Sequence, residues 1–257
     1  MARPTASMLV IGDEILSGRT KDKNTGHLAE VMTELGIALR EVRVVADEPE
    51  AIITAVTNLS ASYTYVFTSG GIGPTHDDIT AECIARAFGV PISIRSDARA
   101  ILEAFYDPGD LNEARLRMAR IPDGASLIDN PLSQAPGFIL ENVYVMAGVP
   151  AIFKVMLDGL RPRLKGVAPI LSHSFRVAVP EGDMAEMLSE LDAAHQEVSI
   201  GCYPFFRGGM GATVILRAED ADALSAAANS LRERLRAIID DISETPPAEP
   251  TAIAASN

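Results

Sequence analysis

Short apolar segments alternate with amphipathic helical segments along the first two thirds of the chain. Residues 7–12 read Ser-Met-Leu-Val-Ile-Gly, and residues 37–45 and 63–69 are similarly rich in apolar and β-branched side chains. The segments between them carry apolar residues three and four positions apart, as within residues 28–35. Because strand–helix–strand units build parallel sheets that are covered by helices on both faces, this alternation predicts an α/β fold with a mostly parallel sheet. Residues 138–140 and 143–146 predict a hairpin within it.

A second, smaller α+β domain is predicted after a Lys-Gly-Val-Ala-Pro segment at residues 165–169. Residues 169–257 hold 14 acidic and 6 basic residues, against 21 and 16 in residues 1–168, so the composition changes at this point. The patterns that follow are typical of a strand, a helix, two strands and a long helix, a βαββα unit. We therefore predict domains at 1–168 and 169–244, with a disordered tail at 245–257 that is rich in Pro, Ala and Ser.

The composition limits the partners that we expect. The 257 residues include 35 acidic and 22 basic ones, a net charge of −13, which argues against non-specific binding to nucleic acid. No apolar stretch approaches the 18 residues needed to span a membrane, and the first residues do not resemble a secretion signal. The two cysteines, Cys83 and Cys202, are too few and too distant for a disulfide framework. We expect a cytoplasmic protein with small-molecule partners, without membrane or nucleic-acid binding.

The glycine-rich segment Gly70–Asp78, which reads Gly-Gly-Ile-Gly-Pro-Thr-His-Asp-Asp, lies between a predicted strand and a predicted helix. Glycines let backbone N–H groups approach an anion closely, and a helix N-terminus favours negative charge. Asp77 and Asp78 would repel a bare phosphate, but a divalent cation that bridges carboxylate and phosphate oxygens removes this conflict. The structural alternative is a tight turn in which Asp78 or Thr80 caps the helix. The candidate phosphate or nucleotide contacts in this segment are Gly70, Gly71, Gly73, Thr75 and His76.

Three further segments follow predicted strands, and ligands of open α/β sheets bind beyond the carboxyl ends of the strands. Asp13 and Glu14 follow the first strand, where they could bind metal or form a solvated loop. Asp47 follows the second strand, and a role as helix N-cap competes with a role in the site. The Gly-Pro-rich turns at 130–137 and 147–150 are either a pocket rim or ordinary turns.

These segments together resemble a known family. Gly12–Gly18, Asn24-Thr25, Gly70–Asp78 and Gly148-Val149-Pro150, in this order, are similar to the molybdopterin-binding (MoaB/Mog-like) domain family, and most of all to its CinA-like branch, which includes the competence/damage-inducible CinA proteins and part of eukaryotic FAD synthase. Residues 175–235 resemble the smaller domain that follows in that branch.

The resemblance implies a three-layer αβα domain and a ligand that is either molybdopterin or a nucleotide diphosphate. It implies metal-dependent pyrophosphate cleavage of ADP-ribose or FAD to AMP, with Mg²⁺, Mn²⁺ or Co²⁺ and a monovalent cation as candidate cofactors. It matches Asp78 and Asp47 to two functional acids of the family, and it implies a homo-oligomer, a dimer or trimer. The catalytic candidates are therefore Asp78 and Asp47, with Asp77 beside Asp78 as a helper. The candidate metal ligands are Asp78, Asp77, Asp13 and Glu14, and the further phosphate contacts are Gly148, Pro150 and Lys154.

Two other functions remain open at this point. The same loop would serve molybdopterin binding or adenylylation in molybdenum cofactor biosynthesis. A non-catalytic module that binds a nucleotide without turnover is the third possibility.

Overall fold

The computed structural model describes residues 2–206 and 209–247, and the chain divides into two compact units, Met1–Val167 and Ala168–Asn257. The predicted tail at 245–257 lies outside the described residues from residue 248 onward. Its first residue was assigned wrongly, because Thr245 is the last residue of a strand.

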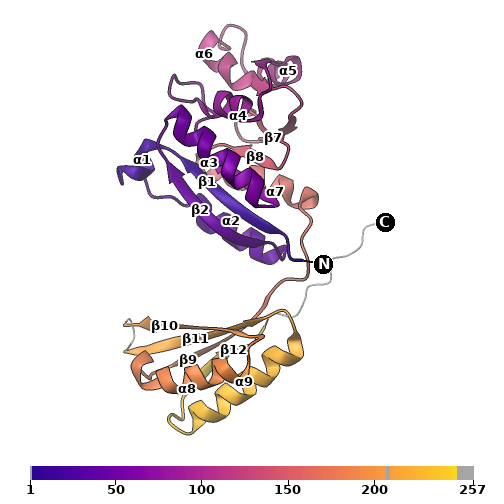
Figure 1. Ribbon diagram of the computed structural model, residues 1–257. Coiled ribbons are helices and arrows are strands. Elements are labelled where there is room, and N and C mark those ends of the chain that lie inside the picture. The colour runs from indigo at the N-terminus through magenta and orange to yellow at the C-terminus, as the bar shows by residue number, and fades with distance from the viewer. Residues whose placement is uncertain (1, 207–208, 248–257) are drawn as a thin grey trace. The chain divides into compact units, whose positions relative to one another are not determined.

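A six-stranded mixed sheet forms the centre of the first unit (Figure 1). Its strand order is β2-β1-β3-β8-β7-β6, and the first four of these strands run parallel. β7 pairs antiparallel with both β8 and β6, which confirms the predicted hairpin and adds an edge strand to it. The bounds are β1 Thr5–Ile11, β2 Ala38–Val45, β3 Tyr65–Ser69, β6 Ser126–Ile128, β7 Gly137–Leu140 and β8 Val143–Met146.

Helices cover both faces of this sheet, so the predicted three-layer αβα architecture is confirmed. α3 (Pro49–Ser62), α4 (Thr80–Phe88) and α5 (Ser96–Phe105) pack on one face, and α2 (Asn24–Glu34) and α7 (Pro150–Leu160) pack on the other. The side chains of β1 alternate between the two cores, since Leu9 and Ile11 join the first and Met8 and Val10 the second. Burial on both faces explains why β1 reads as a continuous apolar run.

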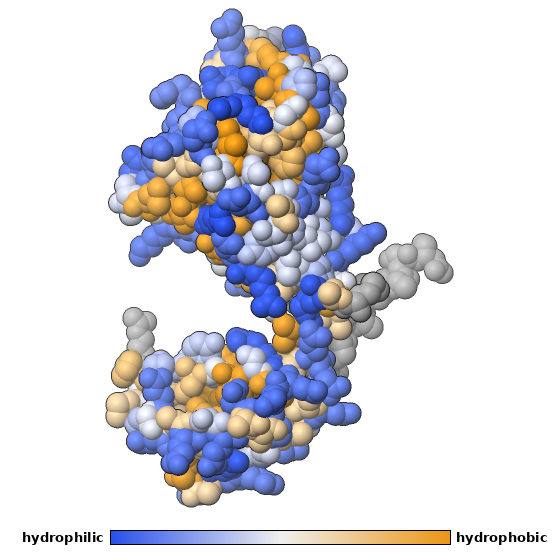
Figure 2. Space-filling model, viewed as in Figure 1, coloured by the Kyte–Doolittle hydropathy of each residue, from blue (hydrophilic) through white to orange (hydrophobic). Residues whose placement is uncertain are grey.

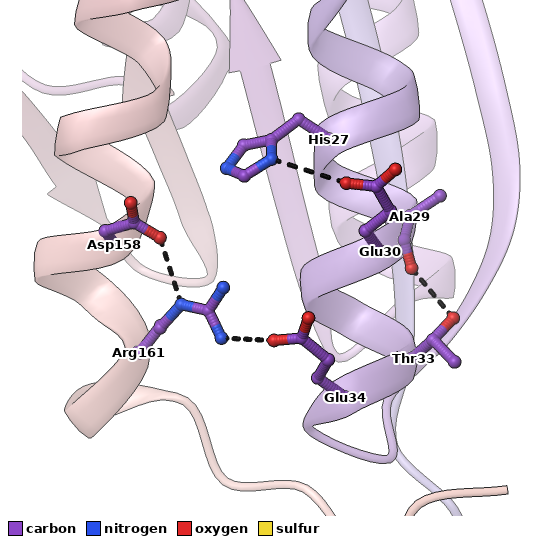
Figure 3. A network of polar contacts seen from close by, with 7 residues as sticks. All are labelled: His27, Ala29, Glu30, Thr33, Glu34, Asp158 and Arg161. Atoms are coloured by element: carbon purple, nitrogen blue, oxygen red, sulfur yellow. Dashed lines mark hydrogen bonds and ion pairs between the residues drawn. The ribbon is translucent and has the colours of Figure 1, made fainter. Parts of the chain in front are cut away.

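An ion-pair network joins α2 to the end of α7 (Figure 3). The guanidinium of Arg161, at the start of the 3-10 helix η2 (Arg161–Arg163), donates to Glu34 at 2.6 Å and to Asp158 at 3.0 Å. The contact holds the C-terminal end of α2 against α7, and the opposite end of α2 contributes to the site described below.

Several short elements complete the first unit. α6 (Glu113–Leu116) is followed directly by the 3-10 helix η1 (Arg117–Ala119). The unpredicted elements are α1 (Asp13–Leu16) and the two-stranded sheet of β4 (Ile92–Ile94) and β5 (Arg120–Pro122).

The second unit is a four-stranded antiparallel sheet with two helices. Its strand order is β10-β11-β9-β12. The βαββα pattern is confirmed, and β12 follows it as an edge strand. The bounds are β9 Leu171–Val177, α8 Glu181–Ala194, β10 Ser199–Phe205, β11 Gly211–Ala218, α9 Ala221–Arg236 and β12 Ile242–Thr245.

Hydrophilic side chains dominate the visible surface of each unit, and smaller hydrophobic areas are scattered among them (Figure 2). One such area lies over α1 and β2, where Leu16, Val42 and Val44 are exposed. Among the described helices, none is both long and apolar enough to cross a membrane.

Candidate functional site

The carboxyl ends of the four parallel strands open into one cavity of about 630 Å³. Ile11 pairs with Val45 across the ends of β1 and β2, and Ser69 pairs with Met146 across the ends of β3 and β8, so the segments after these strands lie next to one another. Each of these segments contributes residues to the lining of the cavity. They are Gly12 and Glu14 after β1, Asp47 after β2, residues 70–74, 77 and 78 after β3, and residues 147–150 after β8. The structure therefore brings together residues from all four segments that the sequence singled out.

Two glycines shape the loop after β3. Gly70 has a backbone φ of +112° and Gly71 one of +67°, and residues other than glycine rarely adopt such positive φ angles. A methyl group on Gly70 would overlap the carbonyl oxygen of Ile11, and one on Gly71 would overlap the hydroxyl of Thr80. The Thr80 hydroxyl in turn donates to the carbonyl oxygen of Gly70 at 3.0 Å, which ties the loop to the first turn of α4.

Asp78 holds the second half of this loop together. Its Oδ2 accepts hydrogen bonds from the backbone N–H of Thr75 at 2.8 Å and from the Thr75 hydroxyl at 2.6 Å. A Cβ atom on Gly73 would lie only 2.6 Å from the same oxygen, so the absent side chain at Gly73 makes room for the carboxylate. Neither Asp78 nor Thr80 acts as the helix cap that the sequence allowed, because Ile79 occupies the N-cap of α4.

Asp47 faces the cavity instead of capping α3, and its predicted N-cap role is wrong. Glu48 is the N-cap residue of α3, without a side-chain cap, while Oδ2 of Asp47 accepts the backbone N–H of Asp13 at 2.9 Å. Burial raises the pKa of Asp47, and although the bond from Asp13 opposes this shift, the charges of Asp13, Glu14 and Asp77 raise the pKa further. Asp47 is therefore less easily ionised than an ordinary aspartate, and it lies among other acids.

Asn24 fixes the relative positions of the strand ends. It is 5% exposed, and its side-chain amide donates to the hydroxyl of Ser69 at 2.7 Å and to the carbonyl oxygen of Gly148 at 2.8 Å. Gly148 lies so close to Gly70 that an added Cβ would be 3.2 Å from the Cα of Gly70. The motif residues Asn24, Gly70 and Gly148 thus form one packed junction beside the cavity.

Part of the remaining wall comes from residues that the sequence did not mark as functional. Tyr106, Arg115 and Met118 line the cavity from the segment that contains α5, α6 and η1. Nothing in their local pattern distinguishes them from an ordinary helical segment. Asn130, Ser133 and Ala135 complete the wall, as expected if the turns at 130–137 and 147–150 form a rim.

Four sequence candidates lie outside the lining of this cavity. The side chain of Thr75 is engaged with Asp78, and that of His76 is 97% exposed. Lys154 is exposed on α7, and Asp13 contributes its backbone N–H to Asp47.

The oxygen donors of the cavity fit a hard divalent cation. The charges of Glu14 and Asp77 raise the pKa of Asp47, and a bound cation would relieve this repulsion. Among the described residues, no group of three His, Cys, Asp or Glu side chains is preassembled as a metal cage. Mg²⁺ does not need such a cage, since it is commonly bound by one or two carboxylates together with substrate phosphates and water.

Comparisons with known proteins identify the family. Residues 7–166 match the family described as "Probable molybdopterin binding domain", and residues 169–241 match the "FAD synthase, middle domain". The chain belongs to the molybdopterin-binding domain family.

The relatives of this molybdopterin-binding domain protein place it in the CinA-like branch. It is 35% identical over 252 residues to a CinA-like protein of Citrifermentans bemidjiense, covering 91% of this chain and 58% of that protein. It is 32% identical over 260 residues to a protein named "Probable FAD synthase" of Caenorhabditis elegans, covering 91% of this chain and 50% of the relative. The chain thus spans little more than half of the length of these relatives.

A solved structure of CinA from Thermoplasma acidophilum supports the fold of the first unit. It superposes with a TM-score of 0.60 at 34% identity and covers 62% of this chain and 97% of that chain. That protein is described as having unknown function, so the likeness adds no activity.

Proposed function

We propose that this protein is a divalent-metal-dependent hydrolase that cleaves the phosphoanhydride of an adenine dinucleotide-type substrate such as ADP-ribose or FAD and releases AMP. The proposal rests on one observation. A glycine-rich loop and four carboxylates line the same cavity at the carboxyl edge of the sheet, and these carboxylates belong to Glu14, Asp47, Asp77 and Asp78. A glycine loop at a helix N-terminus suits phosphate, and the acids suit the cation that phosphate chemistry uses.

In this proposal the loop from Gly70 to Gly73 receives one phosphate. Gly70 and Gly71 leave backbone close to the cavity without side chains in between, and α4 begins at Thr80 behind the loop. Asp78 acts through Thr75, because it maintains the loop conformation by two hydrogen bonds. We therefore assign Asp78 a positioning role.

Glu14 and Asp77 are the side chains that would hold the divalent cation, which when bound offsets negative charge on the phosphates. Asp47 is the catalytic base of the proposal. Its raised pKa makes it a better proton acceptor than an ordinary aspartate near neutral pH, and its Oδ2 is oriented by the N–H of Asp13. Water attacks one phosphorus atom, Asp47 takes a proton from that water, and the bridging oxygen leaves with the second phosphate.

Turnover of defined substrates tests the proposal. Purified protein is incubated with ADP-ribose or FAD in the presence of Mg²⁺, Mn²⁺ or Co²⁺, and AMP is quantified by chromatography. We expect AMP with at least one metal and none after chelation, and a strong loss of rate in Asp78→Asn. The matched variant Asp123→Asn, at an exposed position outside the lining of the cavity, should keep the wild-type rate. Absence of AMP with every metal, or full activity in Asp78→Asn, would overturn the proposal.

Pterin chemistry is the second candidate function, and the family match over residues 7–166 specifically favours it. The same loop and acids would hold a pterin phosphate for adenylylation by ATP. Release of pyrophosphate from ATP only when molybdopterin is present would favour this function over hydrolysis.

A further inference from the structure

An aromatic ring and a guanidinium form a flat wall on one side of the cavity. The guanidinium carbon of Arg115 lies 4.6 Å from the ring centroid of Tyr106, and both residues line the cavity. The ring of Phe105 also contacts that of Tyr106 edge-on, with centroids 5.2 Å apart. The wall therefore combines an aromatic ring with a cation that lies over it.

Local hydrogen bonds hold the guanidinium of Arg115 and the backbone of Tyr106. The guanidinium of Arg115 donates to the carbonyl oxygen of Asp110, and its backbone N–H donates at 2.9 Å to the side chain of Asn112, the N-cap of α6. The backbone N–H of Tyr106 donates at 3.0 Å to Leu102, which is fully buried in the core. A surface that is ordered before a ligand arrives loses less conformational entropy on binding.

The cavity is lined by both acidic and apolar side chains. Carboxylates reach it from the segments after β1, β2 and β3, and apolar side chains reach it from several elements of the first unit. Among these apolar groups Val149 is 56% exposed, although it lies on the cavity. Of the described residues that line the cavity, Arg115 is the only Lys or Arg. The larger apolar side chains that line it together with the wall are Ile11, Ile72, Met118, Val149 and Ile152.

We propose that the wall of Tyr106 and Arg115 is the subsite for the planar heteroaromatic ring of the substrate. A purine, flavin or pterin ring has a π-face that stacks on an aromatic side chain and on a guanidinium plane. The aromatic face of Tyr106 and the apolar side chains that line the cavity suit such a ring, whereas the glycine loop at the start of α4 suits the phosphate. This inference rests on the proposed function only in taking a phosphorylated ring compound as the ligand, and it does not need hydrolysis.

Equilibrium binding separates the ring from the phosphate. Isothermal titration calorimetry with Mg²⁺ compares AMP with ribose 5-phosphate, which carries the same sugar phosphate and no ring. We expect Tyr106→Ala and Arg115→Ala each to weaken AMP binding by about tenfold and to leave ribose 5-phosphate nearly unchanged. Tyr106→Phe keeps the ring and should bind AMP as the wild type does, and Arg99→Ala, an exposed arginine paired with Glu103, is the matched control.

The outcomes distinguish this inference from the proposed function. Ring-dependent AMP binding that requires Tyr106, in a protein without turnover, supports the subsite and overturns only the hydrolase. Hydrolysis together with AMP binding that neither variant weakens overturns only the subsite. An equal loss of AMP and ribose 5-phosphate binding in Tyr106→Ala also overturns it, because the residue would then act through the fold. A parallel titration with FMN shows whether the wall prefers a purine or a flavin ring.

Discussion

The side-chain amide of Asn24 donates a hydrogen bond to the carbonyl oxygen of Gly148 at 2.8 Å and so joins the first turn of α2 to the turn before α7. The same amide donates to Ser69 at the end of β3. One buried side chain thus connects three segments that lie far apart in sequence. The site geometry depends on this connection, because Gly148 in turn packs against Gly70 of the glycine-rich loop after β3.

Replacement of Asn24 should weaken the fold more than replacement of a surface asparagine. Asn24→Ala leaves Ser69, which is 3% exposed, without its donor, and an unsatisfied buried polar group costs about 1–3 kcal/mol. Denaturant unfolding measures this loss. The control is Asn58→Ala, at an exposed position of α3, which should change stability by less than about 0.5 kcal/mol. Equal effects of the two substitutions would contradict the role given to Asn24.

A paired substitution of two glycines separates steric overlap from backbone strain. Gly71 and Gly18 have similar positive φ angles, +67° and +72°, but an added methyl meets the Thr80 side chain only at Gly71. Gly18→Ala should therefore cost about 1 kcal/mol from backbone strain alone. Gly71→Ala should add about 1–3 kcal/mol of overpacking and disturb the phosphate loop. Unfolding midpoints of the two variants compare these costs, and a smaller loss at Gly71 would show that the loop tolerates a side chain.

Neutralising Asp47 should stabilise the metal-free protein. The pKa of Asp47 is raised mainly by burial, so the ionised carboxylate destabilises the native state once the unfolded carboxyl group is ionised. Asp47→Asn removes this charge and keeps an oxygen that can accept the N–H of Asp13. Thermal unfolding in the presence of a chelator should show a higher midpoint for the variant than for the wild type. An unchanged or lower midpoint would mean that the native carboxylate is well accommodated without a cation.

The second unit should lose stability in acid through Glu244. The hydrogen bonds from Arg232 lower the pKa of Glu244 below its ordinary value of 4.5, with a smaller contribution from His173. A lowered folded pKa contributes stability that is present above pH 4.5 and is lost as the pH falls through the folded pKa. The free energy of unfolding of Glu244→Gln should therefore change less than that of the wild type between about pH 6 and about pH 3, the range in which carboxylates titrate. Glu190→Gln, which removes an exposed partner of Arg234, should leave the slope unchanged, and equal slopes for all three proteins would contradict the role of Glu244.

Local sequence patterns were sufficient for the main sheet and its layers. The apolar runs of β1 and β3 and the helical spacing of α2 reflect burial of those elements, which is a property that local sequence records. β4, β5 and β6 were not predicted, because strands of three residues carry too few positions for a recognisable period. β12 was not predicted either, because its polar and charged residues lack the apolar run that marked the equally short β7 and β8.

The site was predictable only where glycines and acids follow strands. The convergence of Glu14, Asp47 and Asp78 follows from parallel strand topology, since all parallel strands deliver their carboxyl ends to one edge. The N-cap role of Asp47 was wrong because the Asp13 N–H, 34 residues away in the chain, competes for its carboxylate. Tyr106 and Arg115 were not recognised for a related reason, as their stacking is a tertiary contact that leaves no local signature.

The rate of AMP release from ADP-ribose by Asp47→Asn and by its neighbour Glu48→Gln tests directly whether Asp47 is the catalytic base. Glu48 is exposed at the N-cap of α3 and makes no side-chain cap, so its replacement matches the change in charge without touching the cavity. With Mn²⁺ present, we predict that Asp47→Asn lowers the rate by about 10²–10⁴-fold, the usual contribution of a general base, whereas Glu48→Gln keeps the wild-type rate. A wild-type rate in Asp47→Asn, or an equal fall in both variants, would contradict the account.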